Sequence, residues 1–109
     1  MTVMVIVETT IFSRLIQELM TDDEYRALQE VLIHRPDMGS LVKGSGGLRK
    51  VRWKLEGRGK SGGARVIYYW ATSDEQIRMI YAYPKGQQAS LSDAQVALLR
   101  KIVERWSDE

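Results

Sequence analysis

The segment LRKVRWKLEGRGKSGGARVIYYWA, residues 48–71, decides the fold of this chain. Its two ends, 48–55 and 65–71, are rich in β-branched and aromatic residues, and the first alternates apolar with charged side chains. Such runs predict two strands, and the glycine-rich stretch between them predicts the loop of a hairpin. The run QIRMIYAYP at 76–84 predicts a third strand, which the turn-rich TSDE joins to the second. Three antiparallel strands in sequence order are the simplest pairing.

The regions on either side add one strand and three helices. VMVIVE at 3–8 predicts a strand, and the segment 9–20 has apolar residues at helical spacing. Thr21 and Glu24 form a capping-box pattern that opens a second helix, which Pro36 ends, and Ser92 with Gln95 opens the last one. The predicted order is β-α-α-β-β-β-α in one α+β domain spanning 1–109.

Composition excludes several classes of protein. The chain has 109 residues and no cysteine, which rules out disulfides, thiol catalysis and cysteine-based zinc sites. The N-terminus lacks an early positive run, and Glu8 interrupts its short apolar run, so we expect neither a signal peptide nor a membrane span.

The distribution of charge is more informative than the net charge of +2. Residues 43–65 carry eight of the 16 Lys and Arg residues but one of the 14 acids, so this segment has a charge of +7 and the rest −5. A concentrated basic element on an acidic body suggests a polyanionic partner, although a solvated basic hairpin would look similar.

The loop contains GRGKSG at 57–62, which partly matches two phosphate-loop patterns. A dinucleotide loop needs a helix after it, because the helix N-terminus binds the pyrophosphate, but a predicted strand follows here. A Walker loop needs a glycine where this chain has Lys54. The context therefore excludes both nucleotide-binding loops.

Strand alternation places Lys50, Arg52 and Lys54 on one face of the sheet and Val51 and Trp53 on the other. Three cations in a row repel one another, so this face favours phosphate binding. Among the aromatic residues of the neighbouring strands, we expect Tyr68 and Trp70 in the core and Tyr83 exposed beside Pro84. Cations near aromatic rings are typical of proteins that bind single-stranded RNA.

Conventional catalytic groups are few. The one histidine, His34, falls at a predicted helix end, and the acids at 22–24 fit a helix cap, so we expect no metal and no other cofactor. A nuclease of this composition would use the 2′-hydroxyl of RNA as nucleophile and cations to stabilise the charged phosphate. A lysine among other cations can also act as general base.

The runs GGLRKVRW, GRGKSGGARVIYYW and IYAYPKG, together with the element order, resemble the RelE/HigB superfamily of toxins from type II toxin–antitoxin modules, and HigB-type members most. The resemblance covers nearly the whole chain. It implies a small antiparallel sheet with two N-terminal helices on one face and a C-terminal helix. It also implies a cytoplasmic, ribosome-dependent endoribonuclease that enters the A site, cleaves mRNA and thereby inhibits translation.

The resemblance assigns roles to individual residues. It implies that Lys50 or Arg52 acts as general base and positions the substrate. It implies that Arg65 stabilises the phosphate in the transition state and that Lys85 interacts with the leaving group or the phosphate. It gives Arg49, Lys54, Arg58 and Lys60 to ribosomal RNA. Relatives have other residues where this chain has Gly86-Gln87, and some have a catalytic tyrosine where it has Ser92, which fits a helix cap. Tyr83 is our candidate to stack on the base instead.

The implied partners are a cognate antitoxin with a helix-turn-helix domain (HigA-like), ribosomal RNA and mRNA, with operator DNA contacted only through the antitoxin. The departures at Gly86-Gln87 and Ser92 leave an alternative, a basic RNA-binding or ribosome-associated module that does not cleave. A DNA-binding regulator is disfavoured because the cations lie on strands and a loop instead of a recognition helix.

Overall fold

The computed structural model describes residues 4–55 and 63–107. The predicted α+β class and the predicted order of helices and strands are confirmed, and a short strand and a single 3₁₀ turn are additions. In chain order the elements are β1 (Val5–Glu8), α1 (Thr10–Leu19), α2 (Asp22–His34), β2 (Ser40–Leu41), β3 (Leu48–Lys54), β4 (Gly63–Ala71), η1 (Thr72–Asp74), β5 (Gln76–Pro84) and α3 (Asp93–Ser107).

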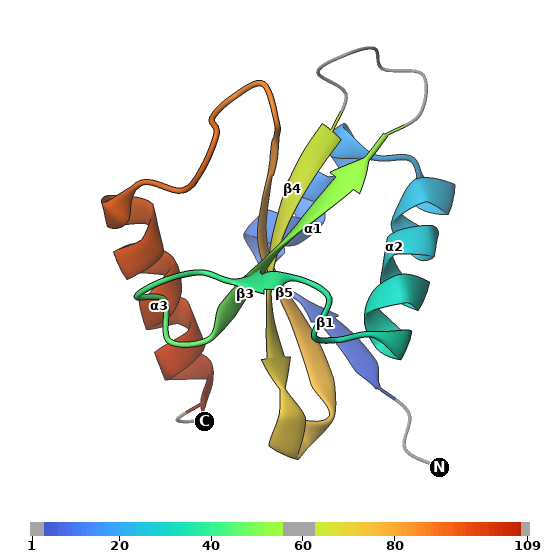
Figure 1. Cartoon of the computed structure of the whole chain (residues 1–109). Coiled ribbons are helices and arrows are strands. Elements are labelled where there is room, and N and C mark those ends of the chain that lie inside the picture. The colour runs from blue at the N-terminus through green and yellow to red at the C-terminus, as the bar shows by residue number, and fades with distance from the viewer. Residues whose placement is uncertain (1–3, 56–62, 108–109) are drawn as a thin grey trace.

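The strands form one five-stranded sheet in the order β1-β5-β4-β3-β2 (Figure 1). The pairs β2–β3, β3–β4 and β4–β5 are antiparallel, which confirms the predicted meander of β3, β4 and β5. Strand β1 runs parallel to β5, so the sheet is mixed and not purely antiparallel as expected. The long connection between these two strands permits this arrangement, since parallel neighbours need a crossover and cannot be joined by a tight turn.

Two hydrophobic cores lie on the two faces of the sheet. On one face, α1 and α2 bury Phe12 and Leu28 against sheet residues such as Val51 and Tyr68. On the other, α3 buries Leu99 and other apolar residues against the sheet. Figure 1 shows α2 and α3 on opposite sides of the sheet. The alternation of each strand divides its side chains between these two faces.

Side-chain caps begin helices α1 and α2. The Thr9 hydroxyl accepts a hydrogen bond from the Phe12 amide at 3.1 Å, at the start of α1. Thr21 and Glu24 form the predicted capping box of α2. These caps satisfy amides that have no partner within the helix.

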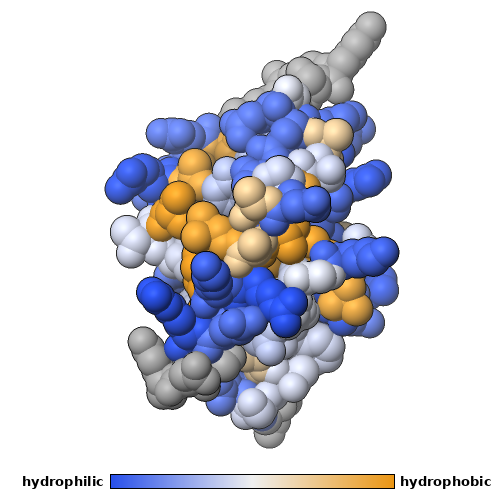
Figure 2. Space-filling view, turned by 90° about the vertical axis from the view of Figure 1, so that its left-hand side faces the viewer, coloured by the Kyte–Doolittle hydropathy of each residue, from blue (hydrophilic) through white to orange (hydrophobic). Residues whose placement is uncertain are grey.

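The α3 side of the molecule carries apolar side chains among hydrophilic ones (Figure 2). Ile11 of α1 and Leu98 of α3 are 46% and 61% exposed, and both line a small apolar hollow between these helices. Among residues 4–55 and 63–107, none of the helices has the length and apolar character needed to cross a membrane.

Candidate functional site

The cations of β3 lie on the part of the sheet face that α3 leaves uncovered. Leu48, which has the same parity, is fully buried in the α3 core, whereas Arg52 and Lys54 further along are exposed and Lys50 is half-buried. Val51 packs on the opposite face with α1 and α2. The predicted alternation of β3 is therefore confirmed, and beyond Leu48 its side chains on the α3 face form a row of cations.

Arg52, Arg65 and Tyr83 form a row across three strands. Arg52 is the partner of Arg65 in the β3–β4 register, and Arg65 is the partner of Tyr83 in the β4–β5 register. Like charges directly opposite one another destabilise a sheet. The ion pairs recorded between described residues, Arg78–Asp74 and Arg100–Glu104, do not involve either arginine of this row. The two arginines are thus adjacent on the same face of the sheet.

Lys85 joins this row from the end of β5. Its amide donates to the Gly63 carbonyl at 2.8 Å, which fixes the backbone after β5 beside the start of β4. A side chain at Gly63 would have its Cβ 3.5 Å from Arg65 Nη1 and 3.7 Å from Lys85 Cδ. The side chains of Arg65 and Lys85 therefore both lie beside Gly63, where a Cβ would make ordinary van der Waals contact with each of them. We call Lys50, Arg52, Lys54, Arg65 and Lys85 the cation face.

The expected exposure of Tyr83 is wrong. Its side chain is 1% exposed and packs in the α3 core with Ile67 and Ile80, and its ring lies 6.0 Å from that of Tyr81. Burial raises the pKa of Tyr83, and the nearby Arg65 acts in the opposite direction. The hydroxyl has no hydrogen-bond partner within the described part of the chain. The buried ring packs in the core beside Arg65 and is not available to stack on a base.

Arg49 is separated from the cation face. It has the parity of Val51, so it faces the other side of the sheet, where its Nη1 donates to the carbonyls of Gly39 at 2.8 Å and Asp37 at 3.2 Å. Its guanidinium group stabilises the connection between α2 and β2. Two other residues expected to bind RNA, Arg58 and Lys60, lie outside the described residues.

Sequence reasoning missed β2, which pairs with β3 and places Ser40 opposite Lys50. The signal was present in GSGG at 44–47, where three glycines have φ of 75°, 76° and 115°. A Cβ on Gly47 would also lie 2.9 Å from Tyr69 Cε1, so a residue with a side chain does not fit there. Such a cluster marks a tight hairpin turn and hence a strand before it.

The site contains cations, hydroxyls and backbone groups. Across the two described ranges, no group of three or more His, Asp or Glu side chains is arranged to hold a metal ion. Ser92, at the position of the catalytic tyrosine in some relatives, accepts from the Gln95 amide at 3.1 Å while its own amide donates to Gln95 Oε1 at 2.9 Å. This capping box confirms the predicted structural role of Ser92.

A comparison with models of protein families identifies the family of this chain. The family model described as "RelE toxin of RelE / RelB toxin-antitoxin system" matches residues 4–108, almost the full length of the chain. The chain belongs to the RelE toxin family. It is accordingly a toxin of a type II toxin–antitoxin system, and an antitoxin is its expected partner.

A solved structure shares the fold of this RelE-family toxin. It is the E. coli toxin RelE in the free state, as a mutant with two arginines changed to alanine. The TM-score is 0.57 at 12% sequence identity, and the match covers 81% of this chain and 90% of that chain. At this identity the likeness shows the fold alone, and the closeness to HigB-type members stays a prediction.

Proposed function

We propose that this RelE-family toxin inhibits translation as a ribosome-dependent endoribonuclease that cleaves mRNA in the A site. The observation that carries the proposal is the opposed pair Arg52–Arg65 with Lys85 beside it. Two guanidinium groups and an ammonium group from neighbouring strands match the charge of a phosphate in its transition state. Lys50 and Lys54 extend the positive charge along the strand and would hold neighbouring phosphates.

The chemistry needs only the RNA and these side chains. The 2′-oxygen forms a bond to phosphorus, its proton passes to a base, and the bond from phosphorus to the 5′-oxygen breaks as that oxygen takes up a proton. The products are a 2′,3′-cyclic phosphate and a 5′-hydroxyl. Lys50 or Arg52 is our candidate to position the 2′-hydroxyl and take its proton, Arg65 stabilises the phosphate, and Lys85 assists the leaving oxygen.

Induced expression in a bacterial host, with mapping of mRNA 5′ ends, tests this function. The wild type should arrest growth and produce cuts within translated frames. Arg65→Ala should lower cleavage by about 10²–10³-fold, as loss of one transition-state donor does in other enzymes. Arg26→Ala is the matched control, because Arg26 is an exposed arginine of α2, on the opposite side of the sheet from α3. Equal arrest by wild type and Arg65→Ala would refute the assignment of Arg65.

A non-cleaving RNA-binding module is the second candidate. The burial of Tyr83 and the use of Ser92 as a helix cap favour it, because neither side chain is free to serve as a catalytic acid or base. RNA that is bound on ribosomes but never cut would establish this alternative.

The antitoxin is expected to be a helix-turn-helix protein encoded beside this gene, and the pair to bind operator DNA through the antitoxin. An adjacent short reading frame for such a protein is the observation to seek. Co-expression of its product should relieve the growth arrest.

A further inference from the structure

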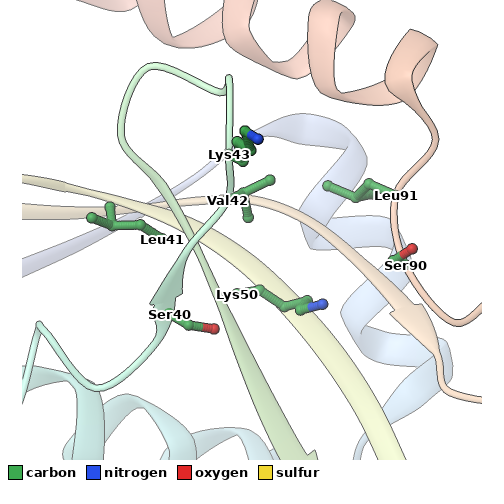
Figure 3. Close-up of a pocket in the computed structure, with 7 residues that line it drawn as sticks. All are labelled: Ser40, Leu41, Val42, Lys43, Lys50, Ser90 and Leu91. Atoms are coloured by element: carbon green, nitrogen blue, oxygen red, sulfur yellow. The ribbon is translucent and has the colours of Figure 1, made fainter.

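A second hollow, of about 200 Å³, opens beside the cation face (Figure 3). Pockets for drug-sized ligands measure about 300–1,000 Å³, so this one suits a single small group. Three segments form its wall: β2 with the turn after it, the next strand β3, and the segment before α3, which is far from both in the sequence. The side chains that matter are Ser40, Val42, Lys43, Lys50, Ser90 and Leu91.

The wall has one apolar and one polar part. In Figure 3 the side chains of Val42 and Leu91 point toward each other, and that of Lys50 extends toward the segment that carries Ser90. Two ammonium groups and two hydroxyls complete the wall, and none of the described residues that line it is acidic. Apolar surfaces accept the flat faces of a nucleobase, hydroxyls can bond its edges, and ammonium groups bind a phosphate. This chemistry fits one nucleotide.

Internal hydrogen bonds hold both sides of the hollow in place. Behind Val42, the buried Ser45 hydroxyl donates to the Val42 carbonyl at 2.6 Å and accepts from the Leu48 amide at 3.0 Å. Arg100 of α3 donates to the Gly44 carbonyl at 3.3 Å in the same turn. On the other side, Gln88 Nε2 donates to the Ser90 carbonyl at 2.8 Å and to Gln95 Oε1 at 2.8 Å. The hollow therefore exists before a ligand enters it.

Lys50 connects this hollow to the cation face. It lies two residues before Arg52 on the same face of β3, which is about 6.7 Å along a strand. Neighbouring phosphates of an extended RNA strand have a similar separation. A phosphate between Arg52 and Arg65 would thus have its neighbour at Lys50 and the attached nucleotide at the hollow.

We propose that this hollow binds the nucleotide next to the phosphate that is cut, with its base between Val42 and Leu91, and so sets a base preference at one position beside the cut. The proposal rests on the proposed function for its consequence, but the binding of a nucleotide can be measured without cleavage.

Titration of the ¹⁵N-labelled protein with each of the four 5′-mononucleotides, followed by NMR, tests the binding. Amides of residues 40–43 and 90–91 should shift, with affinities that differ between bases. Leu91→Trp, which fills the hollow, should weaken binding at least about tenfold, as expected for loss of a base contact. Leu98→Trp is the control, because Leu98 is exposed on α3 and lies outside this hollow. Ser90→Trp, in an exposed segment, serves if Leu91→Trp does not fold.

The outcomes separate this proposal from the proposed function. Inorganic phosphate alone, titrated in parallel, should bind more weakly than any nucleotide, and equal binding would overturn the role of the base. On ribosomes, Leu91→Trp should change the base frequencies on one side of the cut. Identical frequencies in wild type and Leu91→Trp, or the absence of nucleotide-induced shifts in the wild type, would refute the proposal. A wild type that binds nucleotides but never cuts would refute only the proposed function.

Discussion

Replacing Arg52 with threonine should stabilise the fold while it removes a cation of the site. Arg52 is exposed and lies directly opposite Arg65, so its substitution relieves repulsion between like charges. Cross-strand pairs contribute about 0.2–1 kcal/mol, and threonine is well suited to a strand, so the free energy of unfolding should rise by about that amount. For a domain of about this size the midpoint of thermal unfolding should rise by about 1–8 °C.

Arg49→Thr is the matched comparison, because it makes the same change on the same strand but on the other face. The Arg49 guanidinium donates to two backbone carbonyls, of Gly39 and Asp37. Hydrogen bonds from charged donors contribute about 1.5–3 kcal/mol, and partial exposure reduces this, so we expect a loss of about 1–2 kcal/mol. The two substitutions should therefore change stability in opposite directions.

Urea unfolding at low and high NaCl concentration measures both effects. The gain from Arg52→Thr should shrink at high salt, because the Debye length falls from about 30 Å at 0.01 M to about 3 Å at 1 M. The loss from Arg49→Thr should change less, since it comes from short hydrogen bonds. A destabilised Arg52→Thr, or a gain that does not depend on salt, would show that the arginine pair carries no repulsion and would remove our reason for assigning it to a ligand.

Three further predictions concern the scaffold. Ser45→Ala should lower the free energy of unfolding by about 1–3 kcal/mol, because the buried Leu48 amide loses its hydrogen-bond partner. Urea unfolding measures this loss, and Ser73→Ala is the control because Ser73 is exposed. Equal losses from the two substitutions would contradict the prediction. Phe12→Ala should lower the free energy of unfolding by about 3–5 kcal/mol, since Phe12 is fully buried. A loss below about 1 kcal/mol in the same assay would mean that α1 does not pack against the sheet as described. Burial raises the pKa of Tyr83, so the folded state favours the protonated form of its hydroxyl. The contribution of Tyr83 to the free energy of unfolding is therefore complete below about pH 10, and it is lost as the pH rises through the higher pKa of the folded state. Urea unfolding between pH 8 and 11 should show this fall, and Tyr83→Phe should reduce it.

Local patterns in the sequence predict most of the elements, because alternation and caps act over a few residues. Strands β3, β4 and β5 and the caps at Thr21 and Ser92 belong to this class. The direction of β1 does not, since its partner β5 is distant in the sequence and nothing within 3–8 identifies it. Strand β2 has two residues and depends on the free edge of β3, so its own composition predicts little.

The row of cations on β3 was predictable from parity, whereas the burial of Tyr83 was not. Parity places Tyr83 on the side of Arg65, but it does not say how far α3 covers that side. The register shift between Ile67 and Tyr68 adds a further obstacle, because it inserts Ile80 between the residues of β5 paired with β4. A strand with such an irregularity changes which residues face each core after the shift.

The pairing of β1 with β5 also determines when the toxin can form during its own synthesis. Val5 emerges from the ribosome early, but its partner Gln76 follows only after most of the chain has been made. The row formed by Arg52, Arg65 and Tyr83 is likewise incomplete until β5 has emerged. A nascent chain therefore carries the cations of β3 without a finished site, and the ribosome that makes this toxin has nearly completed it before the toxin can fold.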